Sequence, residues 1–336
     1  MKTQKTPGGF ASLLLVAMLT SNLAAQDESR NQLLENPAEP ATATTESRLS
    51  KTADFIRMTE SEDGKPLTLD TAVVTYQRGT TATKVDLIGA VHIGEAAYYE
   101  ELNQLFDQYD VLLYELVAPE GTVIQKNTRS NSDNPISFLQ NATKSFLGME
   151  SQLEKIDYTK PHFLRADMTP EQIAEKMQSR GENMLTLALS ALLDAMRQQN
   201  QAASDSDSAA VANQEMDILE MLQNPQQARI MMARQFAGTD NLDLALGGSL
   251  NQLLVVDRNA EALKVLNAEL SKGHERIGIF YGAAHLPDLE KHLIDDFRFS
   301  KKETRWVKAW DLNKPAESTQ PLDPISAMLN LLKDLK

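Results

Sequence analysis

Cysteine is absent from the 336 residues. Its absence excludes disulfides, thiolate metal ligands and a cysteine nucleophile. The sequence also lacks the Gly-x-Ser-x-Gly turn of serine hydrolases, the phosphate-binding loop of P-loop NTPases and the His-Glu-x-x-His helix of zinc peptidases. Basic residues are in the minority, because 33 Lys and Arg stand against 47 Asp and Glu, for a formal net charge of −14. Such a charge argues against nucleic acid and anionic lipid as partners.

Long apolar runs are missing as well, since no stretch after the first 25 residues reaches the roughly 18 apolar residues of a membrane helix. Residues 1–25 combine a basic start at Lys2 and Lys5, an apolar core over 10–19 and small residues before Ala25. This pattern is typical of a signal peptide. We therefore expect a periplasmic or secreted protein with no stable membrane span after signal removal. The alternative is an uncleaved anchor.

Composition divides the remaining chain into three parts. Residues 26–52 are polar and predict a linker without a core of its own. Residues 53–312 are long enough for one α/β domain with a substantial core, within which about 135–237 has the spacing of a mostly helical insert. Residues 313–336 combine a proline-rich spacer with a short amphipathic helix.

Two short stretches with the same pattern lie near the two ends of this domain. Residues 85–92 and 277–285 are each an apolar run that ends in Gly-x-x-His and leads into a segment with helical spacing. An apolar run bounded by glycine predicts a buried strand, and the glycine allows another backbone or a ligand to approach closely. Both histidines, His92 and His285, are thus expected at strand ends, where α/β sheets bind ligands.

Chance alone does not account for the repeated pattern. With 15 Gly and 5 His in the chain, about 0.2 copies of Gly-x-x-His are expected, and two occur. The pair favours functional histidines over the alternative, in which each is a hydrogen-bonded, half-buried side chain at a turn.

Glu115 interrupts another apolar run, residues 110–117. A carboxylate in an apolar strand is costly to bury unless it is paired or bound to a metal. If this strand is parallel to the first Gly-x-x-His strand, a right-handed β-α-β connection places Glu115 and His92 at the same edge of the sheet. The alternative is a salt bridge between Glu115 and an arginine.

Two imidazoles and one carboxylate can hold a divalent metal ion and leave a coordination position open. His92, His285 and Glu115 are the predicted ligands, and Mn, Co or Zn would suit them. Such an ion lowers the pKa of water and polarises a carbonyl group. Glu115 could instead be the general base. Arg258 could bind a substrate carboxylate or stabilise an oxyanion, or it could pair with Glu115 or Asp257.

The features just described resemble a known family in their order and spacing. They are Gly89-Ala90-Val91-His92, Glu115 after an apolar strand, Asp257-Arg258-Asn259 and Gly282-Ala283-Ala284-His285. Over roughly residues 70–312 the chain resembles the TraB/PrgY–GumN family, which includes the TIKI metalloproteases. The resemblance implies an EreA/ChaN-like α/β fold, with a mixed central sheet built from two related halves. For the TIKI branch it implies a divalent-metal-dependent peptidase that uses the two histidines and the glutamate.

We therefore expect an exported metal-dependent hydrolase, like a metallopeptidase, with a peptide or protein substrate. The first alternative is a non-catalytic protein of the TraB/PrgY type that binds or sequesters a peptide, a metal or haem. The second is a scaffold that uses the helical insert and does not need the histidines.

Overall fold

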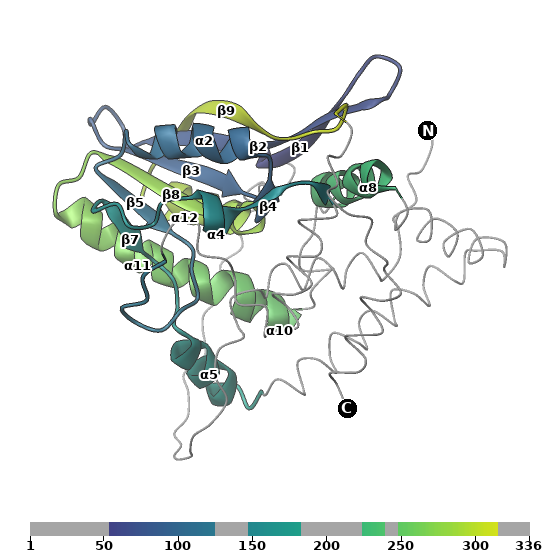
Figure 1. The fold of residues 1–336 in the computed structure, drawn as a ribbon. Coiled ribbons are helices and arrows are strands. Elements are labelled where there is room, and N and C mark those ends of the chain that lie inside the picture. Colours follow the sequence, from purple (N-terminus) through teal and green to yellow (C-terminus); the bar gives the residue numbers. More distant parts are fainter. Residues whose placement is uncertain (1–53, 125–146, 183–223, 239–247, 315–336) are drawn as a thin grey trace.

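The computed structural model describes residues 54–124, 147–182, 224–238 and 248–314 (Figure 1). The expected signal peptide, the linker, nearly all of the C-terminal spacer and helix, and much of the expected insert lie outside these residues. Within them the chain is an α/β protein with a mixed sheet, as the sequence predicts. None of the helices in the described ranges is long and apolar enough to cross a membrane.

Seven strands form the main sheet in the order β1-β2-β3-β8-β5-β7, with β9 paired to β2. They are β1 (Ile56–Glu60), β2 (Pro66–Gln77), β3 (Lys84–Ala90), β5 (Val111–Tyr114), β7 (Phe163–Arg165), β8 (Arg276–Gly282) and β9 (Ser300–Asp311). A small second sheet pairs β4 (Ile93–Gly94) with β6 (Glu150–Ser151) in antiparallel orientation.

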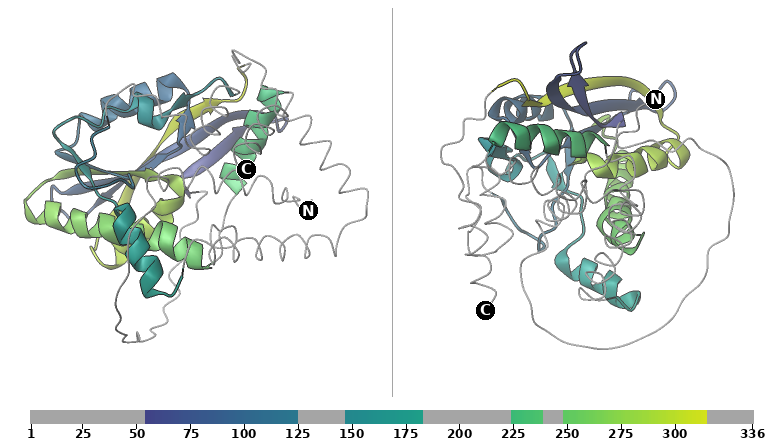
Figure 2. Two further views of the ribbon diagram at one scale, coloured as in Figure 1. Left: turned by 60° about the horizontal axis from the view of Figure 1, so that its bottom comes forward. Right: turned by 90° about the vertical axis from the view of Figure 1, so that its right-hand side faces the viewer.

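Helices lie on both faces of the main sheet: α2 is on one face, and α11 and α12 are on the other (Figures 1 and 2). The helices are α2 (Ala96–Phe106), α4 (Gln152–Lys155), α5 (Pro170–Ser179), α8 (Pro225–Gly238), α10 (Gly248–Asn251), α11 (Asp257–Ser271) and α12 (Leu286–Asp295). A π-helical segment (Gln252–Val256) joins α10 to α11, and a 3₁₀ turn (Ala283–His285) joins β8 to α12.

The three central strands β3, β8 and β5 are parallel, and β8 lies between the other two. In β8 and β5 nearly every residue is buried, as is usual when helices cover both faces of a parallel sheet. β8 comes late in the chain, yet it separates two strands that follow each other closely in sequence. All three strands therefore end at one edge of the sheet.

The antiparallel part of the sheet is built on β2. Apolar runs on either side of the turn residues Arg78-Gly79-Thr80-Thr81 predict a hairpin, and β2 pairs with β3 from Val73↔Ile88 to Gln77↔Lys84. The sequence from Thr304 to Trp310 predicts an edge strand, and β9 pairs only with β2 among the described strands.

The main sheet extends into the range expected to be a helical insert, residues 135–237. β7 pairs with β5 in parallel, and β6 pairs with β4, so the described part of this range contains strands as well as helices. Both strands are too short to produce an alternating pattern in the sequence. The helices of the described part of this range include α4, α5 and α8, and α5 begins with the capping box of Thr169 and Gln172.

Most buried apolar side chains form one core around the main sheet. A second, smaller cluster lies between α5 and the π-helical segment; its buried members are Val117, Met168, Ile173, Met177 and Leu253. Met168 directly follows Asp167, and Val117 lies two residues after Glu115; both acidic residues belong to the candidate site. The site thus borders both clusters.

Candidate functional site

His92 lies at the carboxyl end of β3, in a segment whose backbone is held from two sides. The Gln152 backbone N–H donates to the His92 carbonyl oxygen (2.9 Å), and the Trp310 indole N–H donates to the carbonyl oxygen of Ile93 (2.7 Å). Gln152 and Trp310 come from parts of the chain far from His92. The position of this histidine therefore depends on tertiary contacts.

His285 lies in the 3₁₀ turn after β8 and is only 1 % exposed. Its Nδ1 is 2.8 Å from Oδ1 of Asn259. The Asn259 amide group is oriented, because its Nδ2 donates to Asp288 (2.8 Å) and to the His285 carbonyl oxygen (3.0 Å). Oδ1 is therefore the acceptor, and the hydrogen of a neutral His285 ring is on Nδ1.

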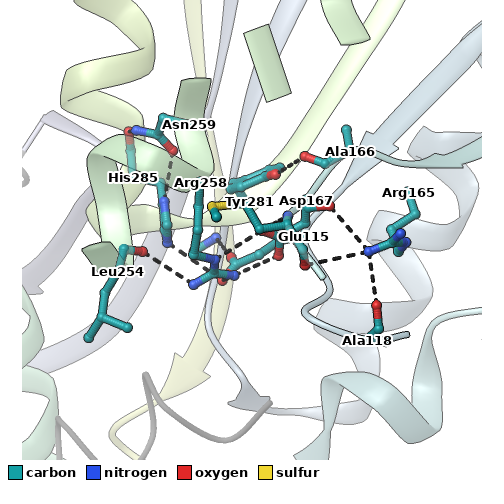
Figure 3. Close-up of polar contacts among 12 residues, drawn as sticks. Glu115, Ala118, Arg165, Ala166, Asp167, Leu254, Arg258, Asn259, Tyr281 and His285 are labelled. Carbon is teal, nitrogen blue, oxygen red and sulfur yellow. Dashed lines mark hydrogen bonds and ion pairs between the residues drawn. The ribbon is translucent and has the colours of Figure 1, made fainter. Parts of the chain in front are cut away.

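Glu115 follows β5 directly and is buried. Its Oε2 accepts the Gly282 backbone N–H (2.7 Å), and its Oε1 accepts Nη2 of Arg258 (2.6 Å). Nε2 of His285 lies 3.5 Å from the same Oε1; Figure 3 shows the two side chains facing each other. Burial by itself would raise the pKa of Glu115, but the charge of the neighbouring Arg258 guanidinium opposes it, and this pKa lies well below its usual range. Glu115 is thus a carboxylate at neutral pH.

Arg258 lies between two buried carboxylates. Its Nε and Nη2 donate to the two oxygens of Asp167 (3.0 and 2.7 Å), in addition to the bond to Glu115 (Figure 3). Nη1 donates to the Leu254 carbonyl oxygen (3.3 Å). Burial lowers the pKa of Arg258, but Asp167 and Glu115 raise it above its ordinary value. The pairing of Glu115 with an arginine is therefore present.

Asp257, the other partner considered for Arg258, is engaged elsewhere. It forms an ion pair with Arg180 at the end of α5 (2.7 Å). The second carboxylate on Arg258 is instead Asp167, which the sequence analysis missed. Asp167 follows the three-residue strand β7, and a strand of this length leaves no pattern by which to recognise a strand-end acid.

The His92 ring interacts electrostatically with Glu115, Arg258 and His285. Burial lowers the pKa of His92, although Glu115 acts in the opposite direction. A lowered pKa leaves the ring neutral at pH 7, with a lone pair on one nitrogen. The structure thus brings all four predicted site residues to one edge of the sheet.

The glycines of the two Gly-x-x-His stretches allow close approach, for different reasons. A Cβ atom on Gly282 would lie 3.3 Å from Oε2 of Glu115, the oxygen that accepts the Gly282 N–H. A Cβ atom on Gly89 would lie 3.2 Å from the Phe55 carbonyl oxygen and 3.4 Å from that of Ala72. Gly89 therefore allows neighbouring backbone to approach closely, and Gly282 allows the Glu115 side chain of the site to do so.

Whether these residues fit a divalent metal ion depends on the donor atoms. A neutral His285 presents the lone pair of Nε2 to the carboxylate of Glu115 at 3.5 Å. Ligand atoms at about 2.0–2.2 Å from a tetrahedral ion lie about 3.3–3.6 Å apart, so a cation fits between this pair. Within the described ranges no group of three or more His, Asp or Glu side chains is arranged so that it could hold a metal ion. The donor types and the separation of one pair, His285 and Glu115, thus suit a divalent ion, whereas three donors are not arranged around one point in this structure.

Comparison of the chain with protein-family models, with curated proteins and with solved structures found no match.

Proposed function

We propose that this protein is an exported metal-dependent hydrolase of the metallopeptidase type, with a TraB/PrgY–GumN-like domain of EreA/ChaN-like fold. His285, His92 and Glu115 would hold a divalent ion such as Mn, Co or Zn, and the substrate would be a peptide or protein. The shared architecture of the two Gly-x-x-His strands supports this proposal, because β3 and β8 are parallel neighbours that each lead into a helix.

The observation that carries the proposal is the meeting of Nε2 of His285 and Oε1 of Glu115. Asn259 keeps the ring hydrogen on Nδ1, so in the neutral ring two acceptor atoms face each other in a buried place. Such a pair is unfavourable unless a proton or a cation lies between them. The 3.5 Å separation is longer than the 2.7–3.2 Å of an ordinary N–H···O bond. A cation accounts for both the orientation and the distance.

The roles of the protein groups follow from their partners. A bound ion would lower the pKa of a water molecule and polarise the substrate carbonyl. Glu115, with its low pKa, is a poor proton acceptor at neutral pH, which favours the ligand role over the general base. Arg258 donates from all three of its nitrogens to protein oxygens, so it positions Glu115 and Asp167 rather than binding substrate.

The test is metal content and turnover of the protein purified without an affinity tag. We expect about one divalent ion per chain and hydrolysis of a peptide panel in the presence of Mn, Co or Zn. His285→Ala and His92→Ala should lose the ion and the turnover while the fold survives, because folding of this domain draws mainly on its apolar core. His292→Ala is the matched control, since His292 is half-buried on α12 and paired with Asp296.

Glu115→Gln separates the two roles of the glutamate. As a ligand, its loss should weaken metal affinity together with turnover, whereas loss of a base would leave the metal bound and lower turnover roughly 10²–10⁴-fold. If the wild-type protein binds metal, peptide or haem but hydrolyses no peptide, the result would contradict the enzyme hypothesis and support the alternative of a sequestering protein. Absence of both metal and turnover in the wild type would end the proposal.

A further inference from the structure

We propose that Gln152 is the positioning residue of His92, and that its amide oxygen accepts the hydrogen of the His92 ring. This inference rests on the proposed function only for the importance of His92; the contact itself is a matter of structure. The consequence is that one ring nitrogen of His92 carries the hydrogen, and the other keeps its lone pair.

The backbone places the two side chains opposite each other. β4 and β6 pair with Ile93 opposite Ser151 and Gly94 opposite Glu150. The same antiparallel register continued by one residue sets His92 opposite Gln152, and the Gln152 N–H donates to the His92 carbonyl oxygen (2.9 Å). Side chains of directly opposed residues lie on the same face with Cβ atoms about 4.5–5.5 Å apart. Contact between them is therefore built into the small sheet.

The orientation of the Gln152 amide group follows from its other contact. Nε2 donates to the Tyr158 hydroxyl at 2.9 Å, which leaves Oε1 as the end that is free to accept from His92. Gln152 is 4 % exposed, and its Oε1 is buried without a hydrogen-bond partner among the described residues. The His92 ring is a polar group with which this side chain interacts. A buried amide oxygen beside a ring N–H is most stable when it accepts that hydrogen.

The same arrangement occurs at the second histidine. Asn259 accepts from Nδ1 of His285 and is itself held by Asp288 and by a backbone carbonyl. Each histidine of the site thus has one buried carboxamide beside its ring. Groups that accept the second ring hydrogen of a ligand histidine fix its tautomer and orientation, and their loss typically lowers metal affinity 10–100-fold.

The test is ¹⁵N NMR of the histidine rings in metal-free protein at about pH 8, where neutral rings report their tautomer directly. We expect one tautomer of His92 in the wild type, assigned with His92→Gln. Gln152→Met keeps the length of the side chain but lacks the oxygen, and should give a mixture of tautomers. Gln152→Glu keeps an acceptor and should restore the single tautomer. His285 should be unaffected in both variants.

Two further measurements keep the inference testable if a variant does not fold or if the protein binds no metal. If Gln152→Met does not fold, the wild type alone decides, because an accepted ring N–H of His92 should exchange slowly with water and give an observable proton signal. An unchanged His92 tautomer in folded Gln152→Met, or a rapidly exchanging ring hydrogen in the wild type, would overturn the inference. Metal affinity is measured separately: a wild type that binds no metal ends the proposed function, yet leaves the tautomer result standing.

Discussion

At the scale of single residues, the site is organised by one buried arginine. Arg258 on α11 joins Glu115 after β5 to Asp167 after β7, so three segments far apart in sequence meet on one guanidinium group. Two carboxylates and one guanidinium carry a net charge of −1. A buried excess of negative charge is costly, and a divalent ion or a protonated histidine beside Glu115 would offset it. The electrostatics therefore agree with the proposed cation site.

Asp167→Asn tests how much of the fold depends on this network. Asp167 is completely buried as a side chain and accepts two bonds from Arg258. Removal of its charge should lower the free energy of unfolding by about 3 kcal/mol, because a buried ion pair loses one partner. Urea denaturation measures this loss.

The control for that prediction is Asp107→Asn. Asp107 also forms an ion pair, with Lys160, but its side chain is 61 % exposed. Its loss should change the free energy of unfolding by no more than about 1 kcal/mol, as for other surface pairs. Equal losses in the two variants would show that the buried network contributes little to stability.

At the scale of secondary-structure elements, the order of the strands creates the site. β8 enters the sheet between β3 and β5, so a strand from the end of the domain supplies Gly282 and His285 beside Glu115. The π-helical segment before α11 ends just ahead of Arg258 and Asn259, two consecutive residues that both face the site. π-helical turns within α-helices are frequent at functional sites. Connection and helix geometry together bring the polar groups to one edge.

Two glycines at the ends of elements allow a prediction that separates site from scaffold. Gly282 closes β8 with φ of −50°, so alanine is allowed there, but its Cβ would press on Oε2 of Glu115 at 3.3 Å. Gly282→Ala should weaken metal binding and turnover at least about tenfold, the loss usual for a disturbed ligand shell, with little change in the melting temperature.

Gly273→Ala should instead lower stability and leave metal binding unchanged. Gly273 ends α11 with φ of +88° and open space around it, so alanine strains the backbone and touches nothing. The free energy of unfolding should fall by about 1 kcal/mol with metal binding unchanged. Thermal melts and metal titration of both variants check the pair; a destabilised Gly282→Ala with normal metal affinity would contradict it.

At the scale of the whole molecule, buried tyrosines predict how stability depends on alkaline pH. Burial and the neighbouring Asp86 raise the pKa of Tyr109 far above the ordinary value of 10, and burial with Glu290 does the same for Tyr76. A raised folded-state pKa means that the stabilisation is complete below pH 10 and is lost as pH rises, because only the unfolded chain ionises readily. The folded state should therefore weaken steeply above about pH 10.

Tyr109→Phe measures how much Tyr109 contributes to this loss of stability at alkaline pH. At about pH 8 the variant should be less stable by about 1 kcal/mol, because the hydroxyl donates to Asp86 at 2.7 Å. Between about pH 8 and 11 the variant should lose about 1 kcal/mol less than the wild type, since each pH unit above the unfolded pKa costs about 1.4 kcal/mol per tyrosine. Urea denaturation at both pH values checks this; parallel losses would contradict the assignment.

Much of the fold is predictable from the sequence, because local patterns encode it. The β2–β3 hairpin, the edge strand β9 and the start of α5 follow from alternation, turn residues and a capping box. β6 and β7 are not predictable, since two or three residues have no period. The sequence therefore predicts a mostly helical insert over about 135–237, whereas the described part of that range also contains the strands β6 and β7.

The sequence by itself determined which side chains are unusual: two histidines after Gly-x-x, and a glutamate at the end of an apolar strand. Only the tertiary structure decided their partners. Asp167 follows a short strand and Gln152 begins α4, and nothing local in the sequence distinguishes either of them. Asn259 belongs to a motif that the sequence shows, but its contact with His285 does not follow from that motif. The physical reason is that burial creates their roles: a carboxylate or amide that water would satisfy on the surface must, inside the protein, find its partner from elsewhere in the chain.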